Sequence, residues 1–149
     1  FLFCSTPAGV PLSLFLHTWF VVKRPGQPAD RFGVYDPMFT APANIEAGHL
    51  HKNLFPLFQG LAVLATWPSG PHFSGTIVAS LEGEEGSLAQ RMVERVYQSY
   101  EDYPARDVYR MFSGPNSNTY TAWLLNQFPE ANITLPSRAY GKGFVGRVN

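Results

Sequence analysis

The fold of this chain is decided by one stretch, Leu14-Phe15-Leu16-His17-Thr18-Trp19-Phe20-Val21-Val22-Lys23. Aromatic and β-branched residues crowd it, and both alternating sets of side chains are mostly apolar, which is typical of a central strand covered on two faces. His17 and Trp19 are two residues apart, so their side chains should point to the same face. The apolar run that contains them, 10–22, is interrupted by His17 and is shorter than the roughly 20 residues of a membrane-spanning helix. We therefore expect a buried strand here.

Turn signals and a second extended run follow this strand. Residues 24–28, Arg-Pro-Gly-Gln-Pro, have turn chemistry, and Arg31 to Tyr35 should return as the second strand of a hairpin. Residues 37–56 show neither a period of two nor one of 3.6, which predicts a long surface excursion. The apolar run 54–65 fits either a short helix or a strand.

The second half of the chain predicts one strand and two helices. Alternation over 73–81 indicates the strand. Ser87 and Gln90 match a capping box, and apolar residues then recur at helical spacing to about Glu101. A second helix should begin after Gly114-Pro115 and end before Pro129. We also expect 107–112 to be extended and 132–135 to form a last edge strand.

Together these elements indicate a single α+β domain over residues 1–149, with an antiparallel sheet packed against helices. The N-terminal segment and the glycine-containing C-terminal tail are expected to be loose, and the tail could be bound by a partner. Cys4 is the only cysteine, so neither a disulfide within the chain nor a cysteine zinc site is possible. Both a cell-envelope and a cytoplasmic location stay open.

Composition bears on the partners of this domain. Eleven basic and eleven acidic residues balance, so the chain lacks the positive charge that a nucleic acid demands, and we exclude that class of ligand. Charged residues make up 15% of the sequence, below the roughly 25% of an average soluble domain. A surface poor in ions favours a protein partner or a nearby membrane.

The run Gly114-Pro115-Asn116-Ser117-Asn118-Thr119 is the strongest functional signal, because it lies where a turn enters an amphipathic helix. Backbone N–H groups and the positive end of the helix face any group placed there, which suits an anion or a nucleophile. Ser117 would need an adjacent base to act as a nucleophile, and His17 on the central strand is the candidate.

These residues resemble the active sites of circularly permuted papain-like proteins, among them the NlpC-type, PPPDE and lecithin:retinol acyltransferase families. In those families a histidine on the first strand precedes an Asn-Cys pair at a helix start, and here His17 and Asn116-Ser117 stand in those places. His17 to Lys23 with Gly114 to Thr119 is more closely similar to an uncharacterised bacterial family, domain of unknown function 3750. The resemblance implies a permuted papain-like fold with Ser117 as nucleophile and His17 as base.

Each of these signals also has an ordinary explanation. Serine and asparagine are preferred helix N-caps, and a histidine on an apolar strand is more often a core residue than a base. His49, His51 and His72 could supply three nitrogens to a metal, but no carboxylate accompanies them at a recognisable spacing, and exposed loop histidines explain them as well. We expect neither a metal nor a cofactor.

The sequence leaves two functions open. The preferred one is a papain-like domain without catalysis, a binding or accessory subunit of a cell-envelope or membrane-associated complex, in which Asn116, Asn118, Thr119 and Trp19 contribute to binding. The alternative is a serine-variant hydrolase or acyltransferase that acts on amide or ester bonds, in which Ser117 attacks, His17 relays the proton, and helix-start N–H groups hold the oxyanion.

Overall fold

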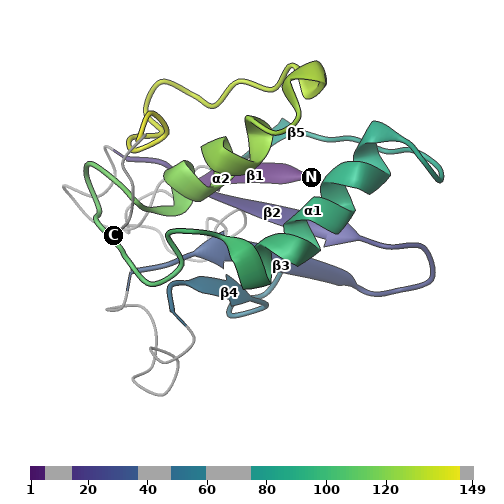
Figure 1. Ribbon diagram of the computed structural model, residues 1–149, viewed down its shortest axis with the longest axis horizontal. Coiled ribbons are helices and arrows are strands. Elements are labelled where there is room, and N and C mark those ends of the chain that lie inside the picture. The colour runs from purple at the N-terminus through teal and green to yellow at the C-terminus, as the bar shows by residue number, and fades with distance from the viewer. Residues whose placement is uncertain (6–14, 37–47, 60–74, 145–149) are drawn as a thin grey trace, which may run out of the picture.

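The predicted central strand lies in the middle of a five-stranded sheet with the order β4-β3-β2-β1-β5, seen in Figure 1. The computed structural model describes residues 1–5, 15–36, 48–59 and 75–144. Every strand pairing is antiparallel, and two helices accompany the sheet, so the chain is an α+β domain. The elements are β1 Leu2–Ser5, β2 His17–Lys23, β3 Ala29–Val34, β4 Leu50–Lys52, β5 Thr76–Ala79, α1 Leu88–Asp102, α2 Ser117–Leu125 and a short 3-10 helix, Pro129–Ala131.

The expected hairpin is confirmed as β2 and β3. The two strands pair with Phe20 opposite Phe32 and Lys23 opposite Ala29, and Gly26 in the turn has a φ of 68°. Glycine reaches this left-handed conformation without the penalty that a Cβ would bring. Both faces of β2 are buried from Thr18 to Val22, as its continuous apolar pattern predicts.

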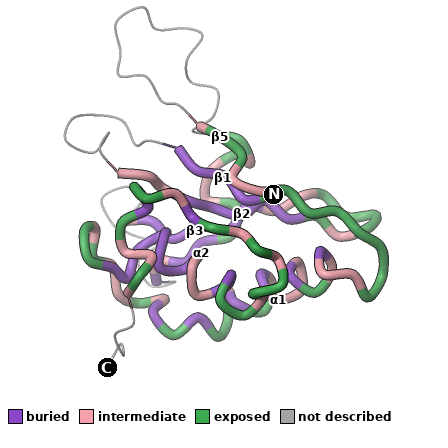
Figure 2. The backbone as a smooth tube through the Cα atoms, turned by 90° about the horizontal axis from the view of Figure 1, so that it is seen from above, coloured by how far each residue is buried: buried purple, intermediate pink, exposed green. Residues whose placement is uncertain are grey.

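The two helices cover one face of the sheet, as Figure 1 shows. Phe20 and Val22 of β2 point to this face and pack in the main core with helix residues such as Met92 of α1 and Leu124 of α2. Trp19 and Val21 point to the opposite face and form a smaller cluster with Phe3. In Figure 2 buried backbone runs through β1, β2 and β3, whereas the connector before α1 is exposed.

Helix α1 begins where the sequence predicts. Ser87 is its N-cap, and the hydroxyl of Ser87 accepts a hydrogen bond from the backbone N–H of Gln90. Glu94 on the outer side of the helix forms a two-pronged ion pair with Arg24, at 2.8 and 2.5 Å, which ties α1 to the end of β2.

Several expectations were wrong. Leu2–Ser5 is not loose: it is the buried strand β1, because it fills the gap between β2 and β5. Residues 107–112 are not extended throughout, since 107 and 111–112 lie in turns, and 132–135 form no strand of the sheet. Residues 50–52 lie within the predicted surface excursion 37–56, yet they form the strand β4, which pairs with β3.

The second helix is shorter than its apolar residues suggest. It ends at Leu125, with Asn126 as C-cap, and Pro129 begins the 3-10 helix rather than marking the end of α2. The tail is also more ordered than expected through Phe144, since Leu135 and Ala139 are buried in the main core. Within the described residues, no helix combines the length and the hydropathy that crossing a membrane requires.

Candidate functional site

The motif Gly114–Thr119 forms the entry to α2, as the sequence predicts. Gly114 has a φ of 81°, and a Cβ at this position would collide with the hydroxyl of Thr119, so the turn requires glycine. Asn116 is the N-cap: its side-chain oxygen accepts hydrogen bonds from the N–H groups of Asn118 and Thr119, at 3.0 and 3.2 Å. The Thr119 hydroxyl accepts in return from the N–H of Asn116, which completes a capping box.

The same side chains also hold the C-terminal tail on the start of α2. The amide of Asn116 donates to the carbonyls of Met111 and Tyr140, at 2.9 and 3.2 Å. The amide of Asn118 donates to the carbonyl of Tyr140 at 2.8 Å, and the Thr119 hydroxyl donates to that of Gly141 at 2.7 Å. All three side chains are thus used inside the fold, and all three residues are buried.

Thr18 is the residue of β2 that meets this helix start. Its hydroxyl lies 2.9 Å from the Thr121 hydroxyl, 3.0 Å from the side-chain oxygen of Asn118 and 3.2 Å from the carbonyl of Ser117. Thr18 and Thr121 are both fully buried. No role was predicted for Thr18, because strand alternation separates the even from the odd positions of β2 but does not say which set faces the helices.

His17 lies on the other face of the sheet. Its ring stacks on Trp19, with centroids 5.8 Å apart, and lies 5.0 Å from the ring of Tyr35. Its Nε2 is shielded from solvent and has no hydrogen-bond partner. Burial, reinforced by the positive charge of Arg31, lowers the pKa of His17 to about 3, so the ring is neutral at physiological pH.

No direct contact therefore supports the predicted pairing of His17 with Ser117. Both residues belong to the described part of the chain, and no hydrogen bond joins them there. Ser117 is the first residue of α2 and is buried, with 3% of its surface exposed. A helix start stabilises a negative charge, but a serine hydroxyl also needs a base, and an imidazole with so low a pKa is a weak one.

Around Trp19 the far face of the sheet holds a cluster of cationic and aromatic side chains. The guanidinium of Arg31 lies 4.3 Å above the ring of Trp19 and donates to the hydroxyl of Tyr35 at 2.9 Å. It also donates to the carbonyls of Pro56 and Gln59, both at 2.8 Å. The Trp19 indole donates to the carbonyl of Leu57 at 3.1 Å. Trp19, a predicted binding residue, is fully buried and serves to dock the segment 53–59 on the sheet.

An exposed aromatic patch lies next to the motif. Phe15 makes edge contacts with Phe112 and Tyr140, with ring centroids 5.0 and 5.2 Å apart. Phe112 is 61% exposed and Tyr140 is 48% exposed. The backbone carbonyl of Tyr140 accepts from Asn116 and Asn118, so this aromatic patch, Phe15, Phe112 and Tyr140, adjoins the start of α2.

The histidines considered for a metal do not come together as ligands among the described residues. His49 contacts the carbonyl of Tyr35 through Nδ1 at 3.2 Å, whereas His51 is buried beside Tyr35 with an unpartnered Nε2. In the described ranges, no group of three His, Cys, Asp or Glu side chains could hold a metal ion. His72 lies outside those ranges.

Comparison with known proteins identifies a family for most of the chain. The family model described as "Protein of unknown function (DUF3750)" matches residues 12–144. No curated protein and no solved structure matches the chain.

Proposed function

The chain belongs to the DUF3750 family of proteins of unknown function, and from that premise we propose that it is a non-catalytic binding domain, an accessory subunit with a permuted papain-like arrangement. Its partner in this proposal is a protein, in a cell-envelope or membrane-associated complex.

The observation that carries the proposal is the use made of the motif side chains. Asn116, Asn118 and Thr119 give their hydrogen bonds to the α2 backbone and to the tail at Tyr140 and Gly141. In a hydrolase, such groups at the entry to the nucleophile helix would have to orient a substrate or a base. Here they stabilise the fold, and the ring of His17, the predicted base, stacks on Trp19 instead.

The aromatic patch supplies the binding surface. Exposed aromatic rings are enriched at protein interfaces because they bury a large area with few rotatable bonds. Phe112 and Tyr140 are the exposed members, and the amide of Asn116 donates to the carbonyls of Tyr140 and of Met111, which precedes Phe112. A partner that docked on the patch would therefore meet a preorganised surface rather than a loose loop.

One feature favours the second candidate, a serine-variant hydrolase or acyltransferase. Ser117 is the first residue of α2, where the positive end of the helix dipole can stabilise an oxyanion. For this function the ring of His17 would have to leave Trp19 and approach the Ser117 hydroxyl.

The two functions are separated by a serine-directed fluorophosphonate probe. A binding domain leaves Ser117 unlabelled, whereas a hydrolase is labelled at Ser117 and loses the label in His17→Ala. In parallel, the native complex is cross-linked and purified from wild type and from Phe112→Ser. Loss of a stoichiometric partner with Phe112→Ser, but not with the equally exposed Ile77→Ser on β5, supports the binding domain. Labelling of Ser117 together with an unchanged partner in Phe112→Ser would refute it.

A further inference from the structure

A concave site lies at the end of β2 that is opposite to the motif 114–119. It is a cavity of about 660 Å³ between the end of β2, the first half of α1 and the connector 80–87. Cavities of roughly 300–1,000 Å³ are the size that binds small molecules in proteins. Nothing in the function proposed above uses this cavity.

The inner wall of the cavity is apolar. Val22 contributes from β2, Ala89 and Val93 from α1, and Leu81 from the connector. A smaller cavity of about 40 Å³ shares these four residues and continues between the sheet and α1, where all of its lining side chains are apolar. An alkyl chain or a ring that entered here would leave water and contact hydrocarbon on several sides.

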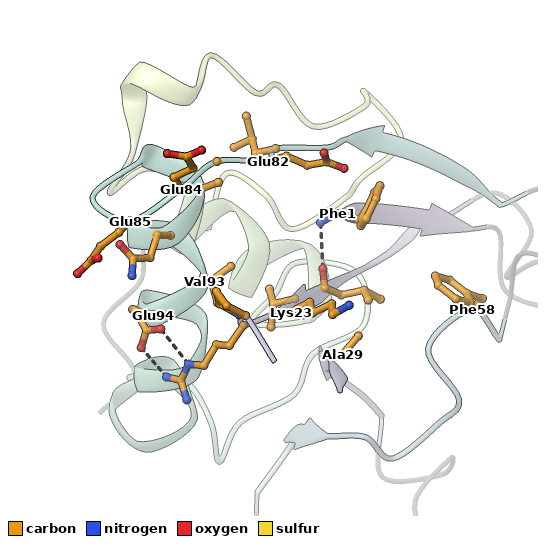
Figure 3. A pocket seen from close by; sticks show the side chains of 17 residues that line it. Phe1, Lys23, Ala29, Phe58, Glu82, Glu84, Glu85, Val93 and Glu94 are labelled. Carbon is orange, nitrogen blue, oxygen red and sulfur yellow. Dashed lines mark hydrogen bonds and ion pairs between the residues drawn. The ribbon is translucent and has the colours of Figure 1, made fainter. Parts of the chain in front are cut away.

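The rim is acidic. Figure 3 shows Glu84 and Glu85 at one side of the cavity and the ring of Phe58 at the other. Glu94 is paired with Arg24. Lys23 is the remaining basic side chain of the rim, so carboxylates exceed cations among the lining residues.

We infer that this cavity binds a small cationic amphiphile, a molecule with an alkyl or aryl group and an ammonium head. The apolar part lies between β2 and α1, and the ammonium lies among the rim carboxylates of Glu84 and Glu85.

Three probes that share an alkyl tail and differ in the charge of the head group test this inference: octylammonium, octanol and octanoate. Binding is measured by calorimetry on the full chain, and the methyl resonances of Val22, Leu81 and Val93 locate it. We expect octylammonium to bind most tightly, octanol more weakly and octanoate most weakly. We also expect the preference for octylammonium over octanol to shrink as salt is raised.

A charge-removing pair of substitutions sharpens the test. The double substitution Glu84→Gln and Glu85→Gln should weaken the binding of octylammonium about threefold or more and leave the binding of octanol unchanged. A factor of this modest size is expected because ion pairs at exposed sites are weak. Glu101→Gln with Asp102→Asn, at the far end of α1, removes the same charge as a control and should change neither probe. Equal affinity for the three heads, methyl shifts outside the cavity, or no binding of any probe would each overturn the inference.

Discussion

At the scale of single residues, Asn116 caps helix α2 and also clamps the C-terminal tail onto it. Its side-chain oxygen accepts hydrogen bonds from two N–H groups of α2, and its amide donates to the carbonyls of Met111 and Tyr140. An alanine there would remove the cap and leave buried polar groups without partners.

We expect Asn116→Ala to lower the free energy of unfolding by about 2 kcal/mol or more, since a lost cap costs about 1 kcal/mol and buried unpaired groups add to it. Ser87→Ala, which removes only the partly exposed N-cap of α1, is the control and should cost about 1 kcal/mol. Urea unfolding measures both. Equal losses would mean that the clamp on the tail contributes nothing.

His17 gives the stability of the protein a pH dependence with a definite sign. The folded state disfavours the protonated ring, because burial lowers the pKa of His17 from the 6.5 of an exposed histidine to about 3. As the pH falls below about 6.5, the unfolded state takes up the proton and the folded state does not. The contribution of the neutral ring is thus complete above that pH and is lost progressively down to about pH 3.

Between pH 7 and pH 4.5 this loss should amount to roughly 2 to 3 kcal/mol. In His17→Phe, which keeps a ring between Trp19 and Tyr35, we expect the drop over the same interval to be smaller by about that amount. Urea unfolding of both proteins at the two pH values is the measurement. If both proteins lose the same stability, His17 is not buried in its neutral form.

At the scale of elements, α2 is fastened to β2 by a buried polar contact between Thr18 and Thr121. Apolar packing is non-directional, and a hydroxyl pair in the core adds a directional hydrogen bond that favours one register of the two elements.

A double-mutant cycle tests this contact. Thr18→Val and Thr121→Val should each destabilise the protein by about 1 to 2 kcal/mol, because each leaves a buried hydroxyl with fewer partners. The double variant should cost less than the sum of the two, with a coupling of about 1 kcal/mol. Additive losses would show that the two hydroxyls act independently.

The elements that the sequence predicted well are those whose signals are local. The β2–β3 hairpin follows from a continuous apolar run and a Pro-Gly turn, and α1 follows from Ser87 and its helical spacing. β1 was missed because four residues carry little periodicity, and what makes them a strand is the gap between β2 and β5. A pairing of that kind depends on contacts distant in sequence.

The site was predictable in the same uneven way. The turn at Gly114-Pro115 and the cap at Asn116 could be recognised from residue types and spacing, and both are present. The face of β2 that meets α2 could not be inferred from the histidine, because side chains alternate and a shift of one residue exchanges the two faces. Thr18 occupies the place beside the helix start that was expected for His17.

At the scale of the whole molecule, the sheet is covered on both faces, and Arg31 organises the side opposite α1 and α2. Its guanidinium holds Tyr35, Pro56 and Gln59 through fixed, diverging donors. Lysine has the same charge but not this geometry.

Arg31→Lys should therefore cost about 1 to 3 kcal/mol in the free energy of unfolding, since the buried Tyr35 hydroxyl and the part-buried carbonyls of Pro56 and Gln59 cannot all keep a donor. Amide hydrogen exchange in 53–59 should become faster, while exchange in α2 stays slow. Arg91→Lys is the control, because Arg91 is exposed and pairs with Glu130 on the surface, and it should change stability by less than about 0.5 kcal/mol. Unchanged exchange in 53–59 would contradict the role assigned to Arg31.

The contact between Thr18 and Thr121 joins residues 103 positions apart. While the ribosome is still building α1, the apolar strand β2 has already emerged, and the helix that covers it near Thr18 does not yet exist. The apolar side chains of β2 therefore stay exposed to solvent until α2 has been synthesised. This exposure makes the nascent chain a substrate for chaperones that shield apolar segments during translation.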